Sequence, residues 1–337
     1  LIIWGADRTL KEIKGMYAFA FYDVLREITT LARDHFGIKP LYYYLDDKAL
    51  IFSSDLDSLR ASRYFFEDYN TDALHYYFKY LCTPHPETIL ENVKKLSPGS
   101  KLIYKNNDFK IVNFYSSKSL KKNRDLTLGN IVKKLDNILK EVVDEHMASD
   151  VSYGAFLSGG IDSSLVVSIM QSISKKPIKT FSIGFNESSN DESLFAKETA
   201  NYLKTKHYQK TILPSDIRNS ISKIISIHDE PFADNSSIPT YFLCEFAKSY
   251  ITVALSGDGG DELFGGYNRY TLGSKIINLP YSLRLLVSKF IKKLSPKKWQ
   301  SIYNSTLSHL SLFKNISNFG DKFHKLSDLK KLELGFL

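Results

Sequence analysis

Apolar and polar residues alternate with two different periods along the chain, and the change of period divides it into two regions. Between residues 15 and 114, short apolar or aromatic runs end in turn residues, a pattern typical of strands in an antiparallel sheet. Strands are predicted at 16–23, 28–32, 41–45, 50–53, 100–104 and 110–114, and helices at 54–61 and 71–80. We therefore expect an antiparallel, mostly β domain in this region.

A polar, lysine-rich stretch at 118–127 is expected to be a linker between domains at 1–117 and 128–337. Beyond it, apolar residues first recur at helical spacing over 128–147. Strands and helices then alternate, and the predicted strands are 151–157, 178–185, 207–212 and 251–255. Such alternation predicts a parallel sheet flanked by helices, in which ligands bind beyond the carboxyl ends of the strands.

The segment 158–164, spelled S-G-G-I-D-S-S, joins a predicted strand to a predicted helix. Its two glycines allow a tight turn and a close approach to backbone amides, and its hydroxyls lie beside the unpaired N–H groups of the helix start. A phosphate gains there from the helix dipole and from several donors together. The alternative, a capped helix after a glycine turn, needs far fewer of these residues. We name this segment the phosphate loop; its candidate ligand residues are Ser158, Gly159, Gly160, Asp162, Ser163 and Ser164.

Two other phosphate or nucleophile motifs do not fit the phosphate loop. A Walker-type loop requires a lysine after its glycines, and none follows here. A hydrolase elbow requires a glycine where Phe156 stands. What remains resembles the loop of the ATP-pyrophosphatase superfamily, whose members cleave ATP between the α and β phosphates to adenylate a substrate.

The segment 256–267, spelled S-G-D-G-G-D-E-L-F-G-G-Y, follows the last predicted strand and is named the acidic loop. Three carboxylates among five glycines concentrate like charge on a backbone that is costly to order. Asp261, facing Asp162, is a candidate to share Mg²⁺ with the phosphates. Asp258 and Glu262 are then left to position a substrate or to accept a proton. The alternative is an acidic turn that caps the next helix.

Two further loops carry candidate contacts. At 182–185, backbone groups and the side chain of Ile183 are expected to hold an adenine ring. The segment 228–239, H-D-E-P-F-A-D-N-S-S-I-P, is stiffened by prolines, and its acids are candidates to line an acceptor pocket; a proline-bounded loop with local Asx caps is an equal alternative. Asp234 and Glu262 are the substrate-binding candidates, while His228 is assigned a structural role.

Composition and charge exclude several classes of protein. The two cysteines, Cys82 and Cys244, match no metal spacing. A disulfide framework is therefore not expected, and we expect a reducing, cytoplasmic environment. No apolar run has the length of a membrane span, and the net charge of +8 is spread as lysine outside any nucleic-acid motif. The basic, amphipathic stretch 283–294 is expected to pack against further helices rather than to bind a membrane surface.

Together, the phosphate loop and the acidic loop resemble the two signatures of the glutamine-dependent asparagine synthetases. The segments 15–23 and 31–43, the latter L-A-R-D-H-F-G-I-K-P-L-Y-Y, are similar to the later part of that family's class II amidotransferase domain. The implied fold class is α/β: a parallel-sheet ATP-pyrophosphatase domain (adenine nucleotide alpha hydrolase-like), preceded by part of an antiparallel α+β amidotransferase domain of the Ntn type.

The resemblance also implies roles for individual residues. It implies that ATP is contacted by Leu157, Ile183, Ser256 and Gly257, in addition to the phosphate loop. It implies that Asp162 and Asp261 bind Mg²⁺ with the pyrophosphate. Asp258 falls where many relatives carry Glu, at a catalytic position tied to formation of the acyl-adenylate; the shorter side chain keeps the charge but changes its reach.

The implied activity is that of a ligase: aspartate is converted to asparagine through β-aspartyl-AMP, with ammonia from glutamine. Residue 1 is Leu where the family's glutaminase has its nucleophilic Cys, and neither the N-G-E motif nor the late lysine of the family is found. We therefore expect a fragment that does not itself hydrolyse glutamine. Alternatives are an acceptor other than aspartate, in sugar amidation, β-lactam closure or peptide cyclisation, or a non-catalytic ATP-binding remnant. The resemblance leaves a homodimer open.

Overall fold

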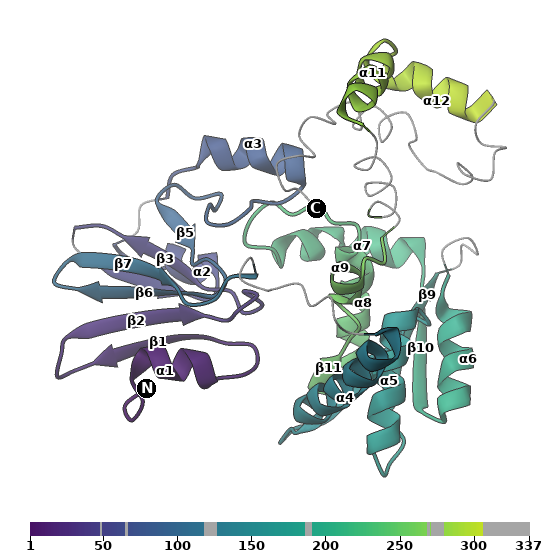
Figure 1. The fold of residues 1–337 in the computed structure, drawn as a ribbon, viewed down its shortest axis with the longest axis horizontal. Coiled ribbons are helices and arrows are strands. Elements are labelled where there is room, and N and C mark those ends of the chain that lie inside the picture. The colour runs from purple at the N-terminus through teal and green to yellow at the C-terminus, as the bar shows by residue number, and fades with distance from the viewer. Residues whose placement is uncertain are drawn as a thin grey trace. The chain divides into compact units, whose positions relative to one another are not determined.

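The computed structural model in Figure 1 describes residues 1–47, 49–64, 67–117, 127–185, 191–267, 270 and 280–305. The chain divides into two compact units. The first consists of Leu1–Gly160 and Val167–Leu255, and the second of Ile161–Val166 and Ser256–Leu337. The predicted linker falls mainly on 118–126, outside the described residues. We call residues 1–117 the N-terminal region of the first unit.

The N-terminal region contains two antiparallel sheets, as its apolar pattern predicts. The four-stranded sheet has the order β1 (Ala18–Asp23), β2 (Ile28–Arg33), β6 (Ser100–Lys105), β7 (Asp108–Asn113). The three-stranded sheet has the order β4 (Leu50–Ser53), β3 (Tyr42–Leu45), β5 (Val93–Lys95). The helices are α1 (Gly5–Glu12), α2 (Leu56–Arg60) and α3 (Thr71–Tyr80). The sequence pattern did not predict α1 or β5.

The core of the N-terminal region forms where residues of the two sheets pack together. Leu31 of β2 and Leu102 of β6 are fully buried and pack with Leu41, Tyr43 and Leu96 around β3. Each such leucine stabilises the fold by about 1.5–3 kcal/mol relative to an exposed one. The alternating apolar positions of the strands thus decide which face of each sheet is buried.

Two adjacent charged residues, Arg33 and Asp34, hold the loop after β2. The Asp34 carboxylate is 1% exposed and accepts hydrogen bonds from the backbone N–H groups of Phe36, Ile38 and Lys39 at 3.0–3.1 Å. Arg33 donates to the carbonyl oxygens of Gly37, Lys39 and Leu96 at 2.7–2.8 Å. Burial alone would raise the pKa of the Asp34 carboxyl, but these backbone donors hold the pKa below its usual value of 3.8.

Asp34→Asn is expected to lower the free energy of unfolding by about 1–3 kcal/mol at pH 7, because a charged acceptor of several backbone donors is lost. The folded-state pKa of Asp34 is lowered, so its stabilisation is present above pH 3.8 and is lost as the pH falls through the folded-state value. Urea unfolding between pH 2 and 7 should therefore show the two proteins converging below about pH 4. A pH-independent difference, or an equal loss in the exposed control Asp150→Asn, would contradict this account.

The rest of the first unit contains the predicted parallel sheet. Its strands follow the order β10 (Lys206–Ile212), β9 (Lys179–Phe185), β8 (Tyr153–Phe156), β11 (Val253–Leu255), and every neighbouring pair is parallel. The helices in this part of the chain are α4 (Leu128–Met147), α5 (Ile161–Ile173), α6 (Ser193–Leu203), α7 (Pro214–Ser226) and α8 (Ser237–Ala247). The first turns of α5, Ile161–Val166, belong to the second unit. The fold class expected from the sequence is confirmed.

Aromatic packing anchors the centre of this sheet. Phe181 of β9 is fully buried, and its ring stacks on Tyr208 of β10 at 5.3 Å between centroids. Ala247 at the end of α8 and Ile251 close the same cluster. Helix α6 lies along β9 and β10 (Figure 1). The strand ends that carry the candidate loops are therefore fixed by a well-packed core.

The second unit contains α9 (Gly260–Phe264), α11 (Tyr281–Lys292) and α12 (Pro296–Ser305). Much of the amphipathic stretch 283–294 forms α11. Trp299 of α12 packs on Phe290 at 5.6 Å between ring centroids and donates to the Ile291 carbonyl at 2.8 Å. Part of the apolar stripe is thus covered by a neighbouring helix. Among the helices described, none is both long and apolar enough to cross a membrane.

Candidate functional site

The first half of the phosphate loop continues directly from the central sheet. Leu157 is 1% exposed, and its N–H donates to the Phe181 carbonyl at 2.9 Å, which extends β8 by one residue. At Gly159 the chain turns with φ of +83°, and a methyl group there would come within 2.6 Å of the Ala196 backbone nitrogen. Both the backbone angle and the space require glycine at this position. The Gly160 N–H donates to Ser158 Oγ at 3.2 Å.

The end of β9 carries the residue predicted to contact adenine. Ile183 is half-buried and packs on the cluster formed by Ile212, Ile224 and Phe242. Its neighbour Ser182 is buried, and its hydroxyl is hydrogen-bonded to His207 Nε2 at 3.1 Å. The side chain of Ile183 is therefore partly committed to the core.

Within the second unit, the start of α5 and the acidic loop lie backbone to backbone. A methyl group at Gly257 would come within 2.7 Å of the Ser163 nitrogen. A methyl group at Gly260 would come within 2.5 Å of the Asp162 Cγ. The two glycines thus permit a contact that no other residue allows without movement. The Asp162 carboxylate consequently faces the residue that precedes Asp261.

The acids of the acidic loop have defined surroundings. Asp258 accepts a hydrogen bond from the Ser256 hydroxyl at 2.8 Å, and Glu262 accepts one from the Tyr267 hydroxyl at 2.7 Å. Asp261 lies in the first turn of α9, where its carboxylate packs so closely on Gly266 that a methyl group there would overlap it. Each of the three carboxylates is therefore held by a contact within its own loop, and Asp258 and Glu262 are at the same time exposed to solvent.

The donor set suits a metal ion that arrives with phosphate. Among the described residues, no group of three or more His, Cys, Asp or Glu side chains is arranged to hold an ion alone. Mg²⁺ is commonly bound by one or two carboxylates, with waters and substrate phosphates completing its octahedron. Asp162 and Asp261 fit that requirement. The Ser164 Oγ, two positions after Asp162, is buried and has no hydrogen-bond partner among the described residues, so it is available to a phosphate oxygen.

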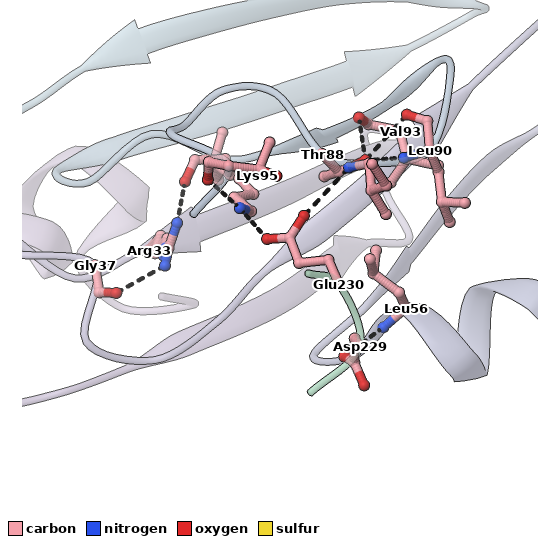
Figure 2. A network of polar contacts seen from close by, with 12 residues as sticks. Arg33, Gly37, Leu56, Thr88, Leu90, Val93, Lys95, Asp229 and Glu230 are labelled. Carbon is pink, nitrogen blue, oxygen red and sulfur yellow. Dashed lines mark hydrogen bonds and ion pairs between the residues drawn. The ribbon is translucent and has the colours of Figure 1, made fainter. Parts of the chain in front are cut away.

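The segment between α7 and α8 divides its acids between two roles. Asp234 is exposed. Its side chain accepts from the Ser236 N–H at 2.8 Å, as in an Asx turn, and its backbone carbonyl accepts from the Ser237 hydroxyl at 2.7 Å. Asp229 and Glu230 instead turn toward the N-terminal region (Figure 2). Of the acids in this segment, Asp234 is therefore the one left for an acceptor.

Comparison with known proteins gives two family matches. Residues 134–334 match the model of asparagine synthase, and residues 1–115 match that of the glutamine amidotransferase domain. The chain is 38% identical over 291 residues to a putative glutamine-hydrolyzing asparagine synthetase 2 of Methanocaldococcus jannaschii, covering 84% of this chain and 56% of that protein. It is 38% identical over 267 residues to a glutamine-hydrolyzing asparagine synthetase 1 of Bacillus subtilis, covering 78% and 41% respectively.

The chain thus spans about half the length of the curated relatives that it matches. Among solved structures it is similar to an NMN synthetase from Francisella tularensis at 15% identity and a TM-score of 0.30, over 63% of this chain and 98% of that one. The two family matches lie on either side of the segment 116–133.

Proposed function

Because the chain belongs to the asparagine synthase family, we propose that it is the nucleotide-binding part of an enzyme that makes asparagine from aspartate, ATP and glutamine-derived ammonia. Residues 1–117 are then the later part of a glutaminase domain, and residues 128–337 belong to the synthetase domain. The relatives' printed names support glutamine as the nitrogen source. A cytoplasmic location and a homodimer remain predictions.

The observation that carries this proposal is the contact between the start of α5 and the acidic loop. Gly257 meets the backbone of Ser163, and Gly260 meets the carboxylate of Asp162. A helix N-terminus with two nearby carboxylates is the combination that a metal-bound polyphosphate requires. An acidic turn that only caps the next helix does not require contact with a second, hydroxyl-rich loop.

We assign the residues of the site as follows. The amides and hydroxyls of the phosphate loop bind the phosphates, and Asp162 and Asp261 hold Mg²⁺, which would neutralise the charge of the pyrophosphate. The rest of the nucleotide is contacted by Leu157, Ile183, Ser256 and Gly257. Asp234 and Glu262 are the candidate contacts of the acceptor.

The reaction then has two steps on this chain's residues. An oxygen of the aspartate β-carboxylate attacks the α-phosphorus of ATP, the bond to the β-phosphate oxygen breaks, and pyrophosphate leaves. The phosphate-loop N–H groups stabilise the charge that develops on the phosphates. Asp258, held by the Ser256 hydroxyl, is assigned to the positioning of the reacting groups during this step. Ammonia next attacks the acyl carbon, AMP leaves, and a proton is lost.

The test is pyrophosphate release by the gene product that contains this chain, with Mg²⁺, ATP and a panel of carboxylic acids. We expect release to depend on aspartate and to be at least about tenfold slower with glutamate or succinate, because a misplaced carboxylate loses alignment for attack. Release with another carboxylate and not with aspartate would assign the chain to a different acceptor. Absence of Mg²⁺-dependent ATP binding would indicate a non-catalytic remnant.

A further inference from the structure

The 228–234 segment joins α7 to α8 in the first unit, and its first acids make long-range contacts. Asp229 Oδ2 accepts a hydrogen bond from the Leu56 N–H at 2.9 Å, across 173 positions of sequence. Leu56 is the first residue of α2, whose preceding Asp55 accepts separately from the Ser58 N–H at 2.7 Å. The start of α2 therefore receives one carboxylate from its own region and one from 228–234.

Glu230 reaches the neighbouring three-stranded sheet (Figure 2). Its Oε2 accepts from the Ile89 N–H at 3.2 Å, and its Oε1 forms an ion pair with Lys95 of β5. The Lys95 and Glu230 side chains are 13% and 14% exposed. Lys95 also donates to the Thr83 carbonyl at 2.7 Å. Loss of either partner would leave an unpaired charge in a largely buried place.

The negative charges of Asp229 and Glu230 also act on Tyr42. Tyr42 of β3 has its pKa raised to about 12, first by burial and then by the negative charges of Glu230 and Asp229. Both carboxylates therefore lie near Tyr42. The contact is an extended one that involves α2, β3 and β5 together.

The other end of the segment leads to the candidate site. The Ala233 N–H donates to the Leu81 carbonyl at 2.9 Å, at the left-handed end of α3. Asp234 then accepts hydrogen bonds from Ser236 and Ser237 at the start of α8. Phe242 of α8 packs in the same cluster as Ile183 at the end of β9. A short path of hydrogen bonds and packed side chains thus runs from the N-terminal region to the predicted nucleotide-binding strand.

We propose that Asp229 and Glu230 are positioning residues that fix the glutaminase-type domain to the synthetase domain and hold the Asp234 loop in place while ammonia is delivered. The docking role rests on contacts alone, whereas the consequence for ammonia use rests on the proposed function. The proposal assigns a role to two acids that neither the reaction steps nor the nucleotide require.

The docking of the two domains is tested by inserting a protease site within 118–126 and cleaving the folded protein there. The two pieces of the unaltered chain are expected to co-elute in gel filtration. Glu230→Lys is expected to weaken their association at least tenfold, and the exchanged pair Lys95→Glu with Glu230→Lys should restore it. The matched control is Glu145→Lys, which breaks the exposed ion pair of Lys14 and Glu145 and should leave association unchanged. Separation of the unaltered pieces, or retention in Glu230→Lys, would overturn the proposal.

The consequence for catalysis is tested in the complete gene product with two nitrogen sources. Glu230→Gln is expected to lower glutamine-dependent asparagine formation at least tenfold, while ammonia-dependent formation stays within threefold of the unaltered enzyme. Glu230→Asp should recover part of the loss. An equal loss with both nitrogen sources would overturn the positioning role. If the unaltered protein makes no asparagine from ammonia, the proposed function fails, and the cleavage experiment still decides the docking.

Discussion

Asp162→Asn is expected to slow aspartate-dependent pyrophosphate release by about 10²–10³-fold, because the site loses a charge that is placed where the phosphates and their cation gather. The Asp162 carboxylate faces Gly260 at the start of α9, next to Asp261. An amide of the same shape keeps that packing but binds a divalent cation weakly. The rate should be measured at saturating ATP and over a range of Mg²⁺ concentrations, where the variant should require more Mg²⁺.

The matched control is Asp144→Asn, an exposed acid on α4, which should leave the rate unchanged. Thermal unfolding should show that Asp162→Asn is folded, with a change in the free energy of unfolding within about 0.5 kcal/mol, as for a substitution away from the core. An unchanged rate and Mg²⁺ requirement in Asp162→Asn would remove this residue from the metal site.

Gly159→Ala is expected to destabilise the chain by about 3 kcal/mol or more and to abolish ATP binding, because two separate requirements for glycine are violated. The residue has φ of +83°, and an added methyl group would lie 2.6 Å from the Ala196 nitrogen. The turn between β8 and α5 must then open or α6 must move. Chemical unfolding, together with titration of an ATP analogue, measures both effects.

Gly129→Ala provides the matched control. Gly129 lies in the first turn of α4, where an added methyl group meets nothing within 4 Å. The same substitution should there be neutral or stabilising by up to about 1 kcal/mol, since alanine favours the helix. Equal behaviour of the two variants would show that the turn at Gly159 is not set by its backbone angle and packing.

Much of the fold could be predicted because the hydrophobic period reports directly on secondary structure. The alternation of strands and helices after residue 128 predicts the parallel sheet, and the sheet is found with all pairs parallel. The neighbouring positions of β8 and β11 could not be predicted, because strand order depends on packing between distant segments. That order brings the two strands that precede the phosphate loop and the acidic loop side by side in the first unit.

The residues missed by sequence reasoning lack local signals. β5 has three residues, of which two are lysines, so it offers no apolar alternation to detect. Asp229 and Glu230 lie in a segment whose prolines and acids suggested an acceptor pocket. Their partners Leu56, Ile89 and Lys95 lie more than a hundred positions away, and a single sequence contains no trace of such pairing. Asp234 stays a predicted contact of the acceptor, on the basis of the sequence motif around it and its position before α8.

The central claim is that ATP adenylates aspartate. It is tested most directly by following a labelled oxygen atom in the same pyrophosphate assay. Aspartate labelled with ¹⁸O in its β-carboxylate should pass one labelled oxygen to AMP, because the carboxylate oxygen that attacks the α-phosphorus stays with AMP when ammonia displaces it. Labelled AMP that forms together with asparagine and only with Mg²⁺ is the predicted result. Pyrophosphate released with unlabelled AMP would show that aspartate is not adenylated and would contradict the account.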